Sequence, residues 1–158
     1  MFALALVTAL GCALLAGAFF VFSAMVMPAL RRLPAPQAIA AMQAINVAAT
    51  RPVFMAAFLG TAALCLALGI TALLRLGPGQ ASTGYFVVGS ALYLVGALLL
   101  TMGYHVPRNN ALASVEPAGA DAEAVWGRYA GGWTAWNHVR AAASLAATGA
   151  LIGGISAP

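Results

Sequence analysis

The residues best suited to chemistry lie between Trp126 and Arg140. Four of them are spaced 7, 4 and 3 positions apart and so share one face of a helix: Trp126, Trp133, Asn137 and Arg140. Trp133 offers a flat indole to an aromatic ligand, Asn137 a hydrogen-bond donor and acceptor, and Arg140 a fixed cation. Arg140 lies in an apolar stretch, and no other such stretch holds an acidic residue. It must therefore reach a polar interface, bond backbone carbonyls or hold an anionic ligand.

Two histidines, His105 and His138, add reactive nitrogens. Either could act as a general base, and together they could be the axial ligands of haem b or two of the ligands of copper. The sequence has no CxxCH motif, which excludes covalently attached haem. A third soft ligand for copper would have to come from Met25 or Met27.

The composition excludes a water-soluble globule. Of 158 residues, 63% are hydrophobic and 6% charged, and the mean hydropathy is +0.96, whereas a soluble domain carries about 25% charged residues. The lipid bilayer is therefore the expected surroundings. The three carboxylates, Glu116, Asp121 and Glu123, lie in one short stretch. This excludes a carboxylate-bridged di-iron or di-manganese site and argues against a proton-coupled transporter.

Charge and cysteine patterns exclude two further kinds of partner or site. The seven arginines are scattered and there is no lysine, so no basic stripe exists and no nucleic-acid partner is expected. Cys12 and Cys65 fall within apolar runs and lack CxxC spacing. We expect them to be buried thiols, with no disulfide and no zinc site.

Four apolar stretches are long enough to cross a bilayer, which takes about 20 residues. They predict an all-α integral membrane protein, a four-transmembrane-helix bundle in a single domain over residues 1–158, with spans at about 2–30, 52–74, 85–104 and 134–155. Ile39, Met42 and Ile45 recur at helical spacing in the first loop, which predicts a short interfacial helix before the second span. Residues 77–84 are expected to form a short turn.

Arginine counting predicts the orientation. Six arginines belong to the first and third loops with their flanks, and only Arg75 belongs to the other side. The positive-inside rule then places both long loops in the cytoplasm and both termini outside, in the inner (plasma) membrane of a bacterium. Both histidines, all four asparagines and all three tryptophans lie on this side, so a polar functional cluster is expected there.

Small residues predict where helices approach closely. The third span has a face of Gly89, Gly96 and Gly103, and the fourth has a face of small residues at Ala142, Ala146, Gly149 and Gly153. Such faces pack against neighbouring helices in lipid or form a homo-oligomer interface.

Several segments together resemble the anthrone-oxygenase-like family of small membrane proteins. The segments are the end of the first span (residues 22–30, with Phe22-Ser23 and Met27-Pro28), residues 42–46, residues 106–112, and the run from Trp133 to Arg140. The stretch at 106–112 is similar to the family's Asn-x-Pro-x-Asn signature, and the last run is similar to its fourth-helix signature. The chain has His105 where the first Asn of the former signature is expected.

The resemblance implies a membrane-embedded oxidoreductase that uses O2, without metal or flavin, on a small hydrophobic aromatic of the phenol, anthrone or quinol type. Under this hypothesis His138 or His105 removes a proton, and Arg140 stabilises the oxyanion. The other residues of the implied site share the tasks of holding charge, stacking the substrate and lining its lipid side. They are Asn137 and Asn109 for the oxyanion, Trp133 and Trp126 for stacking, Phe19, Phe22 and Met25 for the lining, and Asn110, Asn46, Gln43 and Ser23 nearby.

Two other classes of function use the same residues. One is a membrane redox protein that binds haem or copper through His105 and His138, or a quinone beside Trp133. The other is a non-enzymatic membrane binding or scaffold subunit.

Overall fold

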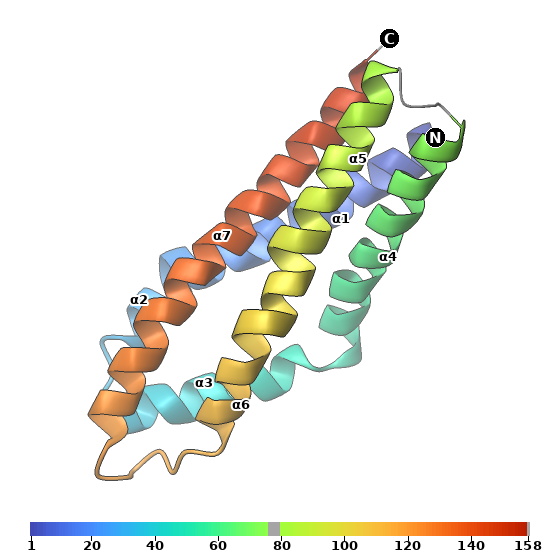
Figure 1. The fold of residues 1–158 in the computed structure, drawn as a ribbon. Helices are drawn as coiled ribbons and strands as arrows, with labels where there is room; N and C mark the ends of the chain where they lie inside the picture. Colours follow the sequence, from blue (N-terminus) through green and yellow to red (C-terminus); the bar gives the residue numbers. More distant parts are fainter. Residues whose placement is uncertain (76–79, 158) are drawn as a thin grey trace.

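Among the described residues, four helical segments are long and apolar enough to cross a membrane. We describe residues 1–75 and 80–157 in a computed structural model (Figure 1). The segments are Phe2–Leu30 (α1 Phe2–Val21, the π-helical turn η1 Phe22–Val26, α2 Met27–Leu30), α4 (Pro52–Arg75), Ala81–Ala113 (α5 Ala81–Tyr93, η2 Leu94–Leu99, η3 Thr101–His105, α6 Val106–Ala113) and α7 (Ala122–Ser156). The predicted all-α membrane bundle is confirmed.

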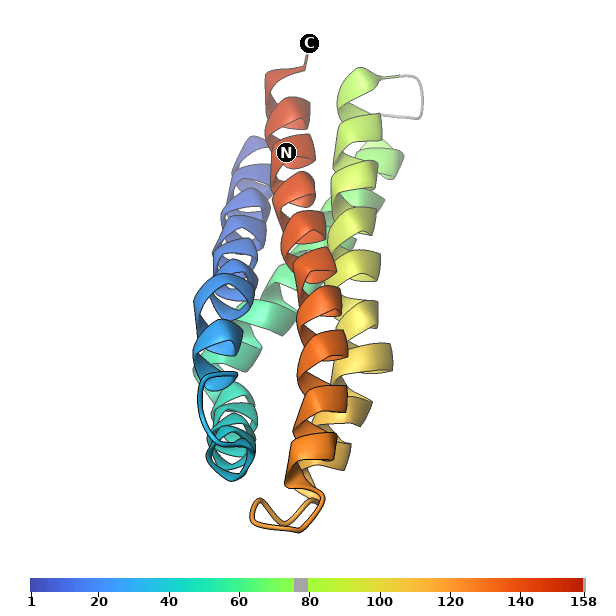
Figure 2. The same cartoon turned by 90° about the vertical axis from the view of Figure 1, so that its left-hand side faces the viewer.

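The predicted helix in the first loop is also present, as α3 (Ala35–Ala49). Ile39 and Met42 on its apolar side are fully buried. Thr50 is the C-cap of α3, and α4 begins two residues later, at Pro52. Both chain termini lie at one end of the bundle, and α3 lies at the other end with the α6–α7 connection (Figures 1 and 2). The polar loops are thus gathered at one end.

Two helices are longer than the spans predicted from hydropathy. The third runs over 81–113 where we predicted 85–104, and the fourth over 122–156 where we predicted 134–155. Hydropathy marks the part of a helix that lies in hydrocarbon, whereas hydrogen bonding continues into the polar ends. The predicted turn at 77–84 is correspondingly shorter, because α5 begins at Ala81; residues 77–79 lie outside the described part.

Prolines explain two of the π-helical turns. Pro28 follows η1 by two residues, and Pro107 follows η3 by two residues. A proline has no N–H to give to the carbonyl four residues earlier, and its ring collides with that carbonyl. The wider π turn, with Met27 N–H bonded to Phe22 O and Val106 N–H bonded to Thr101 O, removes this collision without ending the helix.

Small residues bring α5 and η2 against α7. A Cβ atom on Gly96 would collide with the Cβ of Ala143, and one on Gly89 would collide with Leu151. The side of α7 that packs here is therefore the one with Ala143 and Leu151. Of the predicted face, Ala142, Ala146 and Gly149 are exposed, and only Gly153 packs closely, against the ring of Tyr85 in α5. The homo-oligomer contact suggested for this face stays a prediction.

We predict opposite effects for two glycine-to-alanine substitutions in the third segment. Alanine normally stabilises a helix interior by about 0.5–1 kcal/mol relative to glycine. Gly103→Ala should follow this rule, because a Cβ there meets no atom within 4 Å. Gly96→Ala should instead lower stability by about 1–3 kcal/mol through overpacking against α7. Thermal unfolding of both variants in detergent measures the difference, and equal midpoints would contradict the packing.

Candidate functional site

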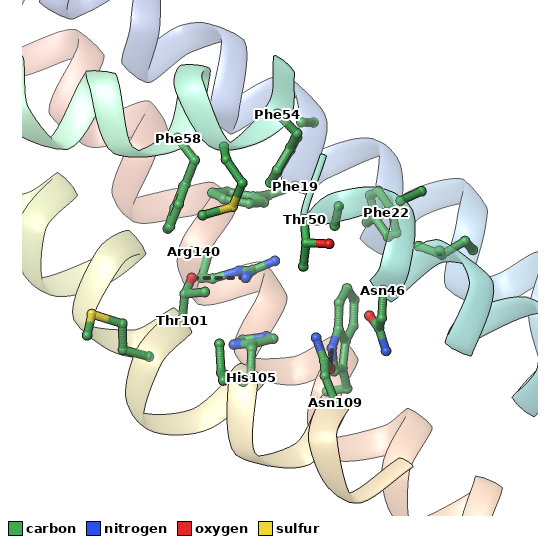
Figure 3. Close-up of a pocket in the computed structure, with 18 of the residues that line it drawn as sticks. Phe19, Phe22, Asn46, Thr50, Phe54, Phe58, Thr101, His105, Asn109 and Arg140 are labelled. Carbon is green, nitrogen blue, oxygen red and sulfur yellow. Dashed lines mark hydrogen bonds between the residues drawn. The ribbon is translucent and has the colours of Figure 1, made fainter. Parts of the chain in front are cut away.

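A cavity of about 680 Å³ lies where α1, α3, α4, the η2–η3–α6 segment and α7 meet (Figure 3). Most of its walls are aliphatic or aromatic. The polar or charged side chains of its lining are Asn46, Thr50, Thr101, His105, Asn109 and Arg140. An apolar cavity of this size with a few convergent polar groups has the character of a small-molecule site.

Arg140 supplies the positive charge of the cavity. Its side chain is 7% exposed, its Nε and Nη2 donate to Asn137 Oδ1 at 3.2 and 2.6 Å, and its Nη1 donates to Thr101 Oγ1 at 3.0 Å. The guanidinium carbon lies 4.1 Å from the centre of the Phe19 ring, a cation–π contact. Since a guanidinium carries five N–H groups, one on each terminal nitrogen remains for a ligand.

Asn137 fixes the position of Arg140. It is fully buried, and its Nδ2 donates to Phe19 O and to Ser23 Oγ, both at 2.7 Å. Phe19 O can only accept and Arg140 can only donate, so the orientation of this amide is unambiguous. Asn137 thereby joins α7 to the last turn of α1 and to η1. It does not itself line the cavity.

His105 is the candidate base. It is 1% exposed, and neither ring nitrogen has a hydrogen-bond partner among the described residues. The ring lies edge-on to the indole of Trp133, with centroids 5.2 Å apart, and it points toward the same space as Arg140 (Figure 3). A buried imidazole without partners costs free energy, and a ligand in the cavity would supply the missing hydrogen bond.

Asn109 joins the indole of Trp133 to the cavity wall. Its Oδ1 accepts hydrogen bonds from Tyr129 Oη at 2.9 Å and from Trp133 Nε1 at 3.0 Å. Because both partners use the oxygen, the amide N–H groups of Asn109 are left for other partners. Asn46 lines the cavity as well, and its Nδ2 is buried without a partner among the described residues.

The other residues predicted for substrate binding divide into three groups: residues that line the cavity, residues that support it from behind, and residues that face outward. Phe19 and Phe22 line the cavity. Trp126 lies behind it, stacked on Tyr129 at 5.8 Å between ring centroids, and Gln43 Nε2 ties α3 to the end of α6 through Leu112 O and Val115 O, each at 2.9 Å. Ser23 is buried as the acceptor for Asn137. Met25, which is 65% exposed, and Asn110 face outward.

The structure does not bring His138 to the cavity. Its side chain is exposed on the outer side of α7. At about 100° per residue, a position two residues before Arg140 lies on the opposite side of the helix. This corrects the expectation that His138 acts beside Arg140. Haem b or copper held between His105 and His138 therefore has no geometric support, and the described residues include no group of three His, Cys, Asp or Glu side chains that could hold a metal.

The contribution of α4 was not predicted from the sequence. Phe54, Met55, Phe58 and Leu59 form one wall of the cavity. Their spacing marks one face of a helix, but α4 is apolar on nearly all sides, so its hydropathy does not single this face out. Thr101 was missed too. Its hydroxyl donates to Ala97 O at 2.6 Å and accepts from Arg140.

A match to a known family covers most of the segments that form this cavity. Residues 52–150, more than half of the chain, match the family model described as Anthrone oxygenase. The chain belongs to the anthrone oxygenase family. The resemblance expected from the motifs is thus confirmed. Neither the curated proteins nor the solved structures gave a match.

The part that matches the anthrone oxygenase family contains the main polar groups of the cavity. Thr101, His105, Asn109, Trp133 and Arg140 all fall within it. The motifs in α1 and α3 lie outside the matched range. The cavity therefore combines a family-typical part with a wall, from α1 and α3, that the match does not reach.

We predict that Asn137 is essential to the stability of the bundle. Asn137→Ala removes the hydrogen bonds to Phe19 O, Ser23 and Arg140 and leaves a charged group without its main acceptor, so unfolding should cost about 3 kcal/mol less than in the wild type. Asn110→Ala, at an exposed position, is the matched control and should change stability by less than about 0.5 kcal/mol. Unfolding in detergent, followed by circular dichroism, measures both. Similar losses for the two variants would show that the Asn137 network does not hold the helices together.

Proposed function

We propose that this protein is a membrane oxidoreductase that oxidises a small hydrophobic aromatic, of the anthrone or phenol type, with O2. The observation that carries the proposal is the shared cavity: an unpartnered His105, a cationic Arg140 and the indole of Trp133 face one apolar space. Membership of the anthrone oxygenase family supports the reaction class.

The proposed reaction begins with proton removal. A ring nitrogen of His105 takes a proton from the acidic methylene of the anthrone, and the resulting anion is delocalised onto the carbonyl oxygen. One N–H of Arg140 donates to this oxyanion in surroundings that exclude water, where such a contact is strongest. Trp133 and Phe22 pack on the flat ring system.

The anion then reduces O2 directly. A C–O bond forms at the former methylene carbon to give a hydroperoxide, which takes up the proton held by His105. Loss of water breaks the O–O bond and leaves the second carbonyl. One anthrone and one O2 thus give one anthraquinone and one water, and no other oxidant or reductant is needed.

We predict that His105→Ala lowers kcat for oxidation of anthrone by about 100-fold or more, the usual loss for a general base. Arg140→Gln should lower kcat by a similar factor through loss of oxyanion stabilisation. His138→Ala is the matched control, because this histidine is exposed outside the cavity, and it should retain the wild-type rate. Oxygen consumption and anthraquinone absorbance, followed with purified protein in detergent, measure all three.

Two results would count against this function. Equal losses of kcat in His105→Ala and His138→Ala would show that His105 is not the base. Anthrone binding that weakens in the cavity variants, while wild-type protein shows no oxygen consumption, would instead identify a non-enzymatic binding protein.

We also propose that α3 and the α6–α7 connection lie in the cytoplasm, with both termini outside. Arg140 faces the cavity and so does not count as a topology signal. Five arginines still lie in or near the loops at the α3 end, and only Arg75 lies at the other end. In a bacterial host, a C-terminal alkaline phosphatase fusion should be active and a C-terminal green fluorescent protein fusion dark. The reverse pair of signals would invert the orientation.

A further inference from the structure

We propose that the ligand enters the cavity sideways from the hydrocarbon layer, through a lateral mouth between α4 and the η3–α6 segment. The lateral mouth is framed by Leu59 on α4 and by Met102 and Val106 on the facing segment. The inference rests on the proposed function only in taking the ligand to be a small apolar aromatic.

The side chains at the lateral mouth form part of both the cavity lining and the outer surface of the bundle. Leu59, Met102 and Val106 line the cavity, yet they are 48%, 59% and 42% exposed on the outside of the bundle. The deeper lining is closed: Phe58 and Trp133 are 5% and 3% exposed. Side chains that are both lining and exposed mark the places where a cavity opens. Ala48 and Thr50 do so at the polar edge beside α3, whereas Leu59 and Met102 do so further from that edge.

Two helices part at this place. α4 packs against α5 and η2, but it has little contact with η3 and α6. Figure 2 shows α4 slanting away from the third segment toward the α3 end. Two other sides are closed, because α7 packs along both α1 and α5 and Gln43 binds α3 to the carbonyls that follow α6. Between α1 and α4 a smaller hollow of about 380 Å³ shares Ala18, Ala48 and Phe54 with the cavity.

The deeper residues of the lateral mouth, Leu59 and Met102, lie at the depth of acyl chains. Arg51 and Arg108 are exposed and mark the polar level on each side. At about 1.5 Å per residue, Leu59 lies about 12 Å deeper than Arg51, and Met102 about 9 Å deeper than Arg108. An apolar ligand dissolved in the bilayer therefore meets the mouth without passing through water.

A reporter thiol inside the cavity tests the route without any oxidation of substrate. Ala18 lines the cavity from α1, so Ala18→Cys, in a chain with Cys12→Ala and Cys65→Ala, places one thiol there. The protein is reconstituted in phosphatidylcholine vesicles and treated with N-phenylmaleimide, which dissolves in lipid, or with a sulfonated maleimide, which does not. We expect fast labelling by the first reagent and slow labelling by the second.

Bulky substitutions then locate the entrance. Met102→Trp should slow labelling by N-phenylmaleimide about fivefold or more, since an obstructed approach acts on the association rate, and Leu59→Trp should do the same from the opposite side. Leu99→Trp is the matched control: Leu99 is 56% exposed on the same segment but does not line the cavity. Thr50→Trp, at the polar edge, reports on entry from water.

Each outcome decides the proposal. Slowing by Met102→Trp and Leu59→Trp alone supports the lateral mouth. The proposal is overturned if Thr50→Trp alone slows labelling, or if all variants label equally. It is also overturned if the sulfonated reagent reacts as fast as the lipid-soluble one, or if neither reagent labels the thiol. Circular dichroism of each variant confirms that it is folded. Because labelling needs no turnover, a supported mouth with no anthrone oxidation would reject the proposed function alone.

Discussion

The burial of Arg140 without a carboxylate is the constraint on which the site depends. A guanidinium within a membrane-spanning helix costs about 2.5–3.5 kcal/mol even on the most permissive scale. The three carboxylates of the chain lie at 116–123, and Glu123 is about 25 Å away along α7. The cost is offset by neutral groups: Asn137 one turn earlier on α7, Thr101 in η3, and the ring of Phe19 in α1. Holding one charge thus fixes three helices relative to one another.

The π-helical turns supply the local geometry that this network needs. η1 follows directly after the turn that contains Phe19 and includes Ser23, the two residues that accept from Asn137. η3 contains both Thr101 and His105, so one widened turn presents the acceptor for Arg140 and the candidate base. Each turn precedes a proline that the helix must accommodate. The prolines therefore do more than limit the length of a helix. By inducing the π turns, they shape the wall of the cavity.

The sequence predicts the four spans well because membrane hydropathy is a property of length and composition. The inward face of residues 126–140 is predictable too: spacings of 7, 4 and 3 leave Trp133, Asn137 and Arg140 within one stripe. The same angular rule, applied between His138 and Arg140, puts them on opposite sides, and proximity in sequence was misleading there. The wall from Phe54 and Phe58 was not predictable, since an apolar helix in lipid has no solvent-facing side to reveal the buried one. The donors that meet the Asn109 oxygen, Tyr129 and Trp133, come from another helix and depend on tertiary contacts alone.

Donors of the protein already occupy several hydrogen-bond acceptors at the site, and this limits the kinds of ligand that can bind. Asn137 Oδ1 is occupied by Arg140, Asn109 Oδ1 by Tyr129 and Trp133, and Thr101 Oγ1 accepts from Arg140 while its proton goes to Ala97 O. The acceptors on these residues are therefore satisfied within the protein. What these residues leave for a ligand is donor capacity, on the guanidinium and the amide of Asn109, together with the two nitrogens of His105. Asn46 and Thr50 add acceptor oxygens only at the α3 edge of the cavity. Such a set favours an apolar molecule whose oxygens accept hydrogen bonds and which gives up a proton to the imidazole, and it disfavours an amine or a cation.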